Sequence, residues 1–217
     1  MNGLTEDRPK PMVEIRGKNL IQHKIDALPL EIDEVVIVVH HMKEVIMNFF
    51  GSKYNGRKII YVDQGEPHGT GHALFSAKDA LNEDFICMFG DDIYDAVDIR
   101  EVIKYPWALT VTPKKSFKDA FNIVSDERGY MKEIICDAEG TADIVMLDIG
   151  LYKFKKDIFN TPLVPLKSKP SEYGLPHTLF AFAEKTAIPL KVITAHSWHM
   201  LNTPEEVLIA EKILSQS

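Results

Sequence analysis

Cysteine is scarce in this sequence, which has only two among its 217 residues. Cys87 and Cys136 lack the spacing of metal ligands, and each lies in an apolar run. We therefore expect two buried thiols in a reducing, cytoplasmic setting, with neither a disulfide framework nor a zinc site. Glycine and proline are not abundant either, at 12 residues each. The 45% of hydrophobic and 26% of charged residues are typical of a globular protein.

An excess of positive charge and a long apolar run are missing too. The 25 lysines and arginines are outnumbered by 32 aspartates and glutamates, which gives a net charge of −7. This balance argues against a nucleic-acid or membrane binder, although a local basic cluster can still bind phosphate. No apolar stretch reaches transmembrane length, and the first residues are not those of a signal peptide. We expect a single domain over residues 1–217, whose core is large enough to be stable without disulfides or bound metal ions.

What the sequence does contain is an alternation of apolar runs and amphipathic stretches. Residues 35–39 are a β-branched run, whose continuity predicts a strand buried on both faces. Further strands are predicted at 59–62, 85–89, 107–111, 121–125, 131–135, 144–154 and 190–195, and helices at 42–50, 71–81, 174–186 and from 203 onward. This order predicts an α/β fold with a doubly wound, mostly parallel sheet and antiparallel additions beside it in the second half.

Two aspartates directly follow the predicted strand at 85–89. Ligands bind beyond the carboxyl ends of strands in open α/β sheets, and a carboxylate placed there can hold a hard divalent cation. Asp91 and Asp92 could equally make a turn or cap the next helix. Lys10 lies between two prolines, which hold its backbone extended, so its ammonium could face a phosphate or belong to an exposed turn.

A glycine-rich segment, QGEPHGTGH at 64–72, joins a predicted strand to a predicted helix. Its glycines would let the backbone approach a ligand closely, and the helix start offers free N–H groups. The two histidines have no evident third partner, so we expect no metal there. A G-x-G-x-x-G fingerprint, a P-loop and a nucleophile-elbow serine are all absent, so the sequence does not support a dinucleotide dehydrogenase or an ordinary kinase.

Six segments, in the same order along the chain, resemble motifs of the sugar-phosphate nucleotidyltransferase family. That family includes glucose-1-phosphate thymidylyltransferases and N-acetylglucosamine-1-phosphate uridylyltransferases. The segments are LTEDRPKPM at 4–12, GKNLI at 17–21, Q with HGTGHAL at 64–74, FGD at 89–91, DIGLY at 148–152 and W with NTPEE at 198–206. They resemble L-T-x-x-x-P-K-P-M, G-K-P-L-I, Q…L-G-T-G-H-A, N-G-D or Y-G-D, N-x-G-I-Y and W-x-x-x-N/G-T-P-E-D. The resemblance therefore covers nearly the whole chain.

The resemblance implies a Rossmann-like nucleotidyltransferase fold and a role for each matching residue. The implied roles are phosphate contact for Lys10, Mg²⁺ binding for Asp91 and Asn202, base binding for Gln64, Gly69 and Thr70, and sugar binding for Asp148 and Gly150. The arrangement of glutamine, glycine and threonine favours a pyrimidine. The implied substrates are thus a nucleoside triphosphate and a sugar-1-phosphate.

The sequence departs from the family at several points. The family begins with a strand and a G-x-G-T-R-M-like loop, and Met1 stands where the last residue of that loop would be. We therefore expect an N-terminally incomplete domain. It would lack the loop N–H groups that cradle the triphosphate. It would also lack a central strand, so that the two strands on either side of it have unpaired backbone groups. The usual Glu-Lys pair is missing around 134–137, Asp148 replaces an asparagine, and Met200 replaces an aspartate of many thymidylyltransferases.

We expect nucleotidyl transfer from a nucleoside triphosphate to a sugar-1-phosphate, with release of pyrophosphate. The alternative from another class is a catalytically inactive nucleotide-sugar or sugar-phosphate binding module. The departures from the family pattern at Cys136 and Met200 favour this alternative. A guanylyltransferase acting on the molybdenum cofactor would share the fold and the Gly-Asp element, but segments 64–74 and 148–152 argue against it. The base, the sugar and the oligomeric state stay open, and another subunit could cover a bare sheet edge.

Overall fold

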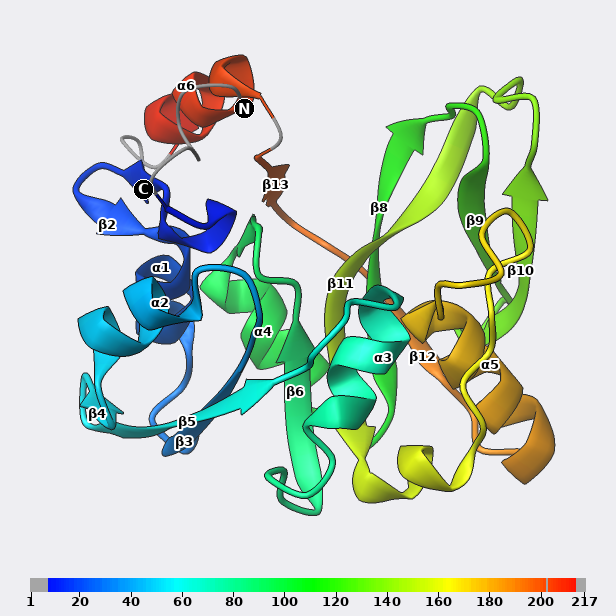
Figure 1. Cartoon of the computed structure of the whole chain (residues 1–217). Coiled ribbons are helices and arrows are strands. Elements are labelled where there is room, and N and C mark those ends of the chain that lie inside the picture. The colour runs from blue at the N-terminus through cyan, green and yellow to red at the C-terminus, as the bar shows by residue number, and fades with distance from the viewer. Residues whose placement is uncertain (1–7, 202, 214–217) are drawn as a thin grey trace.

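The computed structural model describes residues 8–201 and 203–213 and confirms the α/β class (Figure 1). Its α-helices are α1 (Leu20–Ala27), α2 (Lys43–Phe50), α3 (Gly69–Ser76), α4 (Ala96–Val102), α5 (Leu175–Thr186) and α6 (Pro204–Ile213). Two short 3₁₀ helices, η1 (Lys10–Met12) and η2 (Lys156–Asn160), complete the helical elements of the described residues. None of these helices has the length and apolar character that crossing a membrane requires.

The strands alternate with the helices in the first half and follow one another in the second. They are β1 (Glu14–Ile15), β2 (Lys18–Asn19), β3 (Glu34–Val39), β4 (Lys53–Tyr54), β5 (Arg57–Asp63), β6 (Asp84–Met88), β7 (Asp92–Tyr94), β8 (Ala108–Lys115), β9 (Ala120–Ser125), β10 (Met131–Asp137), β11 (Ile144–Lys155), β12 (Lys191–Thr194) and β13 (Trp198–Met200). Every strand predicted from the sequence is present. The helix predicted at 71–81 ends at Ser76, because reverse-turn bonds such as Ala80 N–H to Ala77 O replace the helical ones.

The larger sheet has the strand order β12-β8-β11-β6 and mixes both directions. Strand β12 is parallel to β8, whereas β11 is antiparallel to both of its neighbours. We expected the antiparallel strands beside the main sheet, and β11 lies inside it instead. Its pairing explains this position: the first half pairs with β8, an irregularity follows between Asp148 and Tyr152, and Tyr152 and Lys153 then pair with β8 on one side and β6 on the other.

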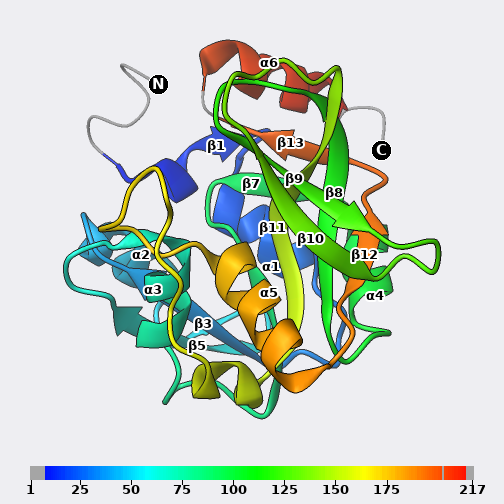
Figure 2. The same cartoon turned by 90° about the vertical axis from the view of Figure 1, so that its right-hand side faces the viewer.

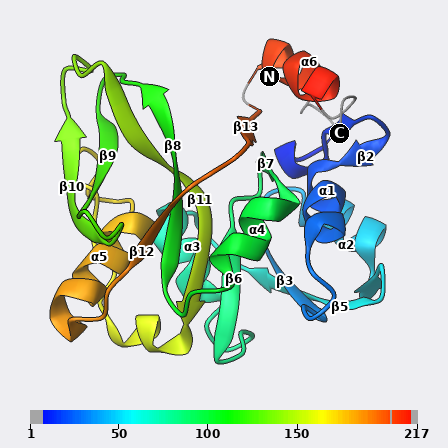
Figure 3. The ribbon, with the colours of Figure 1, turned by 180° about the vertical axis from the view of Figure 1, so that it is seen from behind.

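The second sheet has the order β3-β5-β4, and it ends on β3 where the larger sheet ends on β6 (Figures 1 and 3). The amide of Asn82 donates to Glu34 Oε2 at 3.1 Å, which joins the starts of these two strands. Val35, Ile86 and Met88 pack against the same core cluster. Across residues 8–201 and 203–213, however, no strand pairs with the second edge of either β3 or β6. Residues 35–38 are consequently only half-buried, and the prediction of burial on both faces is wrong for them.

The core lies on both faces of the larger sheet, because successive side chains of β11 point in opposite directions. Tyr152 and Phe154 pack with α3 and α5, while Ile149 and Leu151 pack with α4 on the other face. Figure 2 shows α5 lying across one face of this sheet. The core therefore fixes the positions of the strand ends, where the candidate site lies.

The two cysteines differ from the expectation that both are buried. Cys87 lies in β6, and burial raises the pKa of its thiol to about 12. Cys136, by contrast, is exposed, because β10 pairs with β9 alone and turns this side chain to the solvent. An apolar run in the sequence thus does not guarantee burial on a two-stranded ribbon.

Candidate functional site

Lys10 and Asp91, which are 81 residues apart in sequence, meet at the carboxyl end of β6. The ammonium of Lys10 donates to Asp91 Oδ2 at 2.6 Å. Lys10 opens η1 directly after the extended Pro9, and Asp91 follows β6 in a turn. Their side chains are 24% and 43% exposed, so the pair can be reached from the solvent. The structure thus joins the residues predicted to contact phosphate and metal.

Beneath this pair lie two charged residues that sequence reasoning missed or left undecided. Lys24 of α1 is buried, and its ammonium donates to the carbonyl oxygens of Gly90 at 2.9 Å and Leu20 at 3.4 Å. Burial lowers the pKa of Lys24 to about 8. Asp92 is buried as well, and burial, followed by the charge of Asp91, raises the pKa of its carboxyl to about 7. The signal for Lys24 was its position on the apolar stripe of α1, between Ile21 and Ile25.

Two of the predicted base-binding residues, Gly69 and Thr70, lie at the start of α3, against the loop before α5, whereas Gln64 directly follows β5. Gly69 has a φ of +90°, and a Cβ there would lie 2.7 Å from the carbonyl oxygen of Tyr173. The hydroxyl of Thr70 accepts from Leu175 N–H at 3.1 Å, although the residue as a whole is exposed. Gln64 extends the pairing of β3 with β5 through its N–H, which donates to Val39 O at 3.0 Å. Gly69 and Thr70 therefore already have a structural role.

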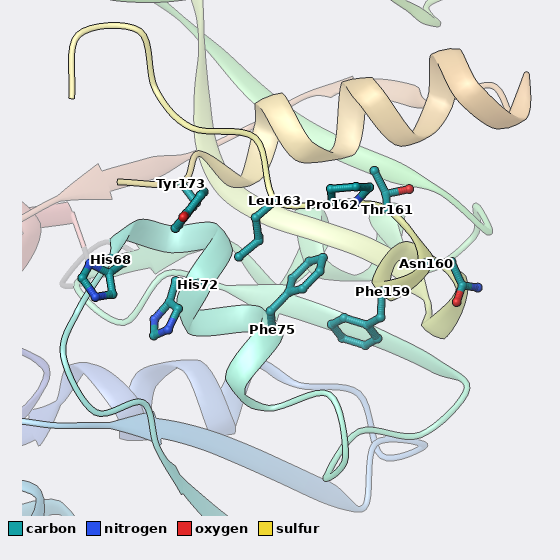
Figure 4. Close-up of a pocket in the computed structure, with 9 residues that line it drawn as sticks. All are labelled: His68, His72, Phe75, Phe159, Asn160, Thr161, Pro162, Leu163 and Tyr173. Atoms are coloured by element: carbon teal, nitrogen blue, oxygen red, sulfur yellow. The ribbon is translucent and has the colours of Figure 1, made fainter. Parts of the chain in front are cut away.

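A cavity of about 730 Å³ runs along one side of α3 (Figure 4). Its lining is largely aromatic and has no carboxylate, lysine or arginine: it is made by His68, His72, Phe75, Phe159, Asn160, Thr161, Pro162, Leu163 and Tyr173. The two imidazole rings stand edge to face at 5.2 Å. Among the described residues, no group of three His, Cys, Asp or Glu side chains could hold a metal. The cavity therefore suits a flat, neutral group more than a phosphate.

The predicted sugar-side residues lie in the irregular part of β11. The carboxyl of Asp148 accepts from the Tyr152 hydroxyl and from Gly150 N–H. Burial raises its pKa to about 6, although these two hydrogen bonds oppose the shift. Gly150 has a φ of +74°, and a Cβ there would lie 2.1 Å from the ring of Phe89, so only glycine fits.

The sugar-side segment and the Gly90–Asp91 turn are held together through Phe89. Its N–H donates to Gly150 O at 3.0 Å, and the hydroxyl of Tyr94 donates to Ile149 O at 2.9 Å. The first bond extends the pairing of β6 with β11 by one residue, and the second ties β7 to the same part of β11. Asp148 and Gly150 therefore lie close to the turn that carries Asp91, as a shared site requires.

Asn202, the second predicted metal ligand, lies outside the described residues. The strand before it, β13, pairs with β7, so that Met200 lies opposite Asp92 and Trp198 opposite Tyr94. The end of β13 thus lies beside the aspartate turn. Asp91 presents a partly exposed carboxylate there, and Mg²⁺ typically takes only one or two protein carboxylates together with water and phosphate oxygens. The donor set at the turn fits such an ion.

Comparison with known proteins assigns a family to this fold and site. Residues 1–110 match the family model described as Nucleotidyl transferase. The chain belongs to this family, whose members generally use a divalent metal. The resemblance to sugar-phosphate nucleotidyltransferases and the Rossmann-like fold are thereby confirmed.

Individual relatives agree with this assignment. The UTP–glucose-1-phosphate uridylyltransferase AglF of Haloferax volcanii is 30% identical over 224 residues, which cover 98% of this chain and 90% of that protein. The bifunctional protein GlmU of Methanocaldococcus jannaschii is 36% identical over 171 residues, but these cover 79% of this chain and only 40% of GlmU. The structure of a UDP-glucose pyrophosphorylase complexed with UDP-glucose has a TM-score of 0.76 at 19% identity, over 96% of this chain and 90% of its own.

Proposed function

We propose that this chain transfers a nucleotidyl group from a nucleoside triphosphate to a sugar-1-phosphate and releases pyrophosphate. The observation that carries the proposal is the contact of Lys10 with Asp91 at the carboxyl end of β6, in a chain of this family. The relative AglF, a UTP–glucose-1-phosphate uridylyltransferase of nearly the same length, supports it.

The proposed reaction needs alignment and charge neutralisation rather than a protein nucleophile. An oxygen of the sugar-1-phosphate attacks the α-phosphorus, the bond from that phosphorus to the β-phosphate oxygen breaks, and pyrophosphate leaves. Lys10 would turn from Asp91 to a phosphate oxygen of the incoming triphosphate. Because a partly exposed ion pair contributes only about 0–1 kcal/mol, this exchange of partners costs little.

Asp91, with Asn202, would hold the divalent cation, which we propose to be Mg²⁺. When bound, the ion would supply positive charge that offsets the negative charge of the phosphates. The residues' own part is to present oxygen ligands: Asp91 does so from the tip of a strand fixed on β11, and this rigidity keeps the ligand in place.

Gln64, Gly69 and Thr70 would contact the base, with a pyrimidine favoured, and Asp148 and Gly150 the sugar. The structure limits how they can do so. Gly69 and Thr70 can offer a ligand only the groups that the Tyr173 loop leaves accessible. The carboxyl of Asp148 already accepts hydrogen bonds from Tyr152 and Gly150, so a bond from a sugar hydroxyl would be its third.

The direct test is pyrophosphate release in the presence of Mg²⁺, with UTP, dTTP, CTP or GTP and a panel of sugar-1-phosphates. We expect turnover with a pyrimidine triphosphate, and a loss of at least about 100-fold in Asp91→Asn, since the substitution removes the charged ligand. The matched control is Asp157→Asn on the exposed side of η2, which should leave both rate and melting temperature unchanged. Near-wild-type turnover by Asp91→Asn would contradict the assignment of Asp91.

The same assay separates the proposed enzyme from the binding-module alternative. Nucleotide sugars are titrated into the chain in parallel, by calorimetry. A chain that binds nucleotide sugars but releases no pyrophosphate with any substrate pair is a binding module, and the proposed function then fails.

A further inference from the structure

Lys24 of α1 is buried, although lysine is usually a surface residue. Its residue exposure is 7%, whereas Lys18 at the start of the same region is exposed and pairs with Asp26 at 2.6 Å. Burying an ammonium is costly unless hydrogen bonds and opposite charges compensate. A cation kept at such a position, on the apolar stripe of α1, calls for a reason beyond the packing of the helix.

The contacts of Lys24 point to the Gly90–Asp91 turn. Its Nζ donates to Gly90 O at 2.9 Å, across 66 residues of sequence. All described peptide bonds are trans, so the carbonyl and the following N–H point in opposite directions. Holding the carbonyl of Gly90 on the interior ammonium therefore turns the N–H of Asp91 away from the interior.

The turn is also held from the side of η1. Pro11 Cγ lies 3.4 Å from the position that a Cβ on Gly90 would take, so the proline packs directly on the glycine. Lys10, the neighbour of Pro11, is the residue that contacts Asp91. Pro11 thus holds the turn from one side and Lys24 holds it from the interior. Together they fix the position from which the Asp91 carboxylate is presented.

Groups of both signs meet at the turn. Asp91 and Asp92 bring two carboxyl groups, and Lys10 and Lys24 bring two amino groups. Lys10 is the partner that can leave when a phosphate arrives, because it is partly exposed. Lys24 is enclosed, so it stays on the carbonyl of Gly90.

We propose that Lys24 is a positioning residue, which fixes the Gly90–Asp91 turn and thereby presents Asp91 to a divalent cation. The proposal rests on the proposed function in that Asp91 serves as the metal ligand. It makes Lys24 act through Gly90 and Asp91 without touching a substrate. It also predicts that removing the ammonium weakens cation binding while the fold persists.

The test compares Lys24→Met, which keeps the length of the side chain and removes its charge, with Lys18→Met as the matched surface control. Binding of Mn²⁺ to the whole chain, in the presence of UTP, is measured by electron paramagnetic resonance. We expect Mn²⁺ affinity to fall about tenfold or more in Lys24→Met, as for other residues that orient metal ligands, and to stay unchanged in Lys18→Met. In the activity assay kcat should fall while KM for the sugar-1-phosphate stays the same.

The outcomes separate this inference from the proposed function. If the wild type binds Mn²⁺ through Asp91 but releases no pyrophosphate, the proposed function fails and the Mn²⁺ affinities still decide the role of Lys24. Equal affinities of Lys24→Met and the wild type overturn the inference, and so does a wild type that binds no Mn²⁺. If Lys24→Met does not fold, Lys24→Arg takes its place: an affinity within about threefold of the wild type supports the inference, and a loss above about tenfold overturns it.

Discussion

At the scale of single residues, Asp148 shows a conflict between burial and charge. Its carboxyl accepts two hydrogen bonds, yet its pKa is raised from 3.8 to about 6 because burial outweighs them. The folded chain therefore binds this proton more tightly than the unfolded chain does. The free energy of unfolding that this group contributes is greatest below about pH 4 and is lost as the pH rises to about 6.

We expect Asp148→Asn to remove this loss and to be more stable than the wild type at pH 7. A shift of about two pKa units corresponds to about 3 kcal/mol, from which one weakened hydrogen bond takes about 1 kcal/mol. The expected gain is about 1–2 kcal/mol at pH 7, with little difference near pH 4. Urea unfolding of both proteins between pH 4 and pH 7 measures it. The exposed Asp143→Asn is the control, and a gain that does not depend on pH would contradict this explanation.

Sequence reasoning at this scale reached the residues that belong to contiguous motifs. The approach of Lys10 to Asp91 could be expected, because both lie in segments that resemble family motifs. Their roles in catalysis stay predictions. The burial of Lys24 was missed despite its place on the apolar stripe of α1, because lysine is almost always at the surface. Its contact with a carbonyl appears only in three dimensions. The need for glycine at Gly150 arises from a ring 61 residues away in sequence, at Phe89.

At the scale of elements, the start of α3 and the loop before α5 form one unit. The N–H of Gly71 donates to Tyr173 O at 2.9 Å, and the N–H of Tyr173 donates to His68 O at 2.8 Å. Gly69 lies between these bonds and leaves room for the loop backbone. The loop is therefore docked by main-chain contacts, which depend on the absence of a side chain at one position.

We expect Gly69→Ala to destabilise the chain more than Gly65→Ala. Both glycines have positive φ, at +90° and +63°, so both substitutions bring backbone strain of about 1 kcal/mol or more. A Cβ at Gly65 meets nothing within 4 Å, whereas one at Gly69 meets the backbone of Tyr173 at 2.7 Å. The extra loss should be at least about 1 kcal/mol in urea unfolding, because the loop must shift. Equal losses would show that the docking contributes little.

The sequence predicted the long elements well and the short ones poorly. Periodicity identified β3, β5, β6, β8 and β11, whose apolar runs are long enough to show a pattern. Strands of two or three residues such as β1, β2, β4, β7 and β13 have no period to detect, and they exist only because their partners are close. The helix end at Ser76 was likewise set by local turn bonds.

At the scale of the whole molecule, the two sheets end side by side on β3 and β6. The bonds from Lys58 N–H to Asp33 O and from Gln64 N–H to Val39 O place the odd-numbered residues of β3 toward β5. In β6, the bond from Phe89 N–H to Gly150 O directs the odd-numbered residues toward β11. Even-numbered amides of both strands therefore point to the edges at which no strand of the described residues pairs.

Hydrogen exchange should reveal this alternation. We expect the amides of Val36 and Ile86 to exchange at least about 100-fold faster than those of Ile37 and Cys87, because only the second pair is bonded to a neighbouring strand. Exchange rates of single amides from nuclear magnetic resonance at neutral pH give the comparison. Slow exchange of all four amides would mean that the edges are covered in solution, and its dependence on protein concentration would then show whether a second copy covers them.

The neighbouring unpaired edges have a practical consequence for the use of this molecule. A sheet interrupted at one place can be completed by one strand, and a short peptide attached to another protein could supply it. The chain would then be the large fragment of a complementation pair, in which assembly reports that two fused proteins have come together. The side chains of Val35, Ile86 and Met88, which pack against one core cluster, would favour an apolar residue in such a tag.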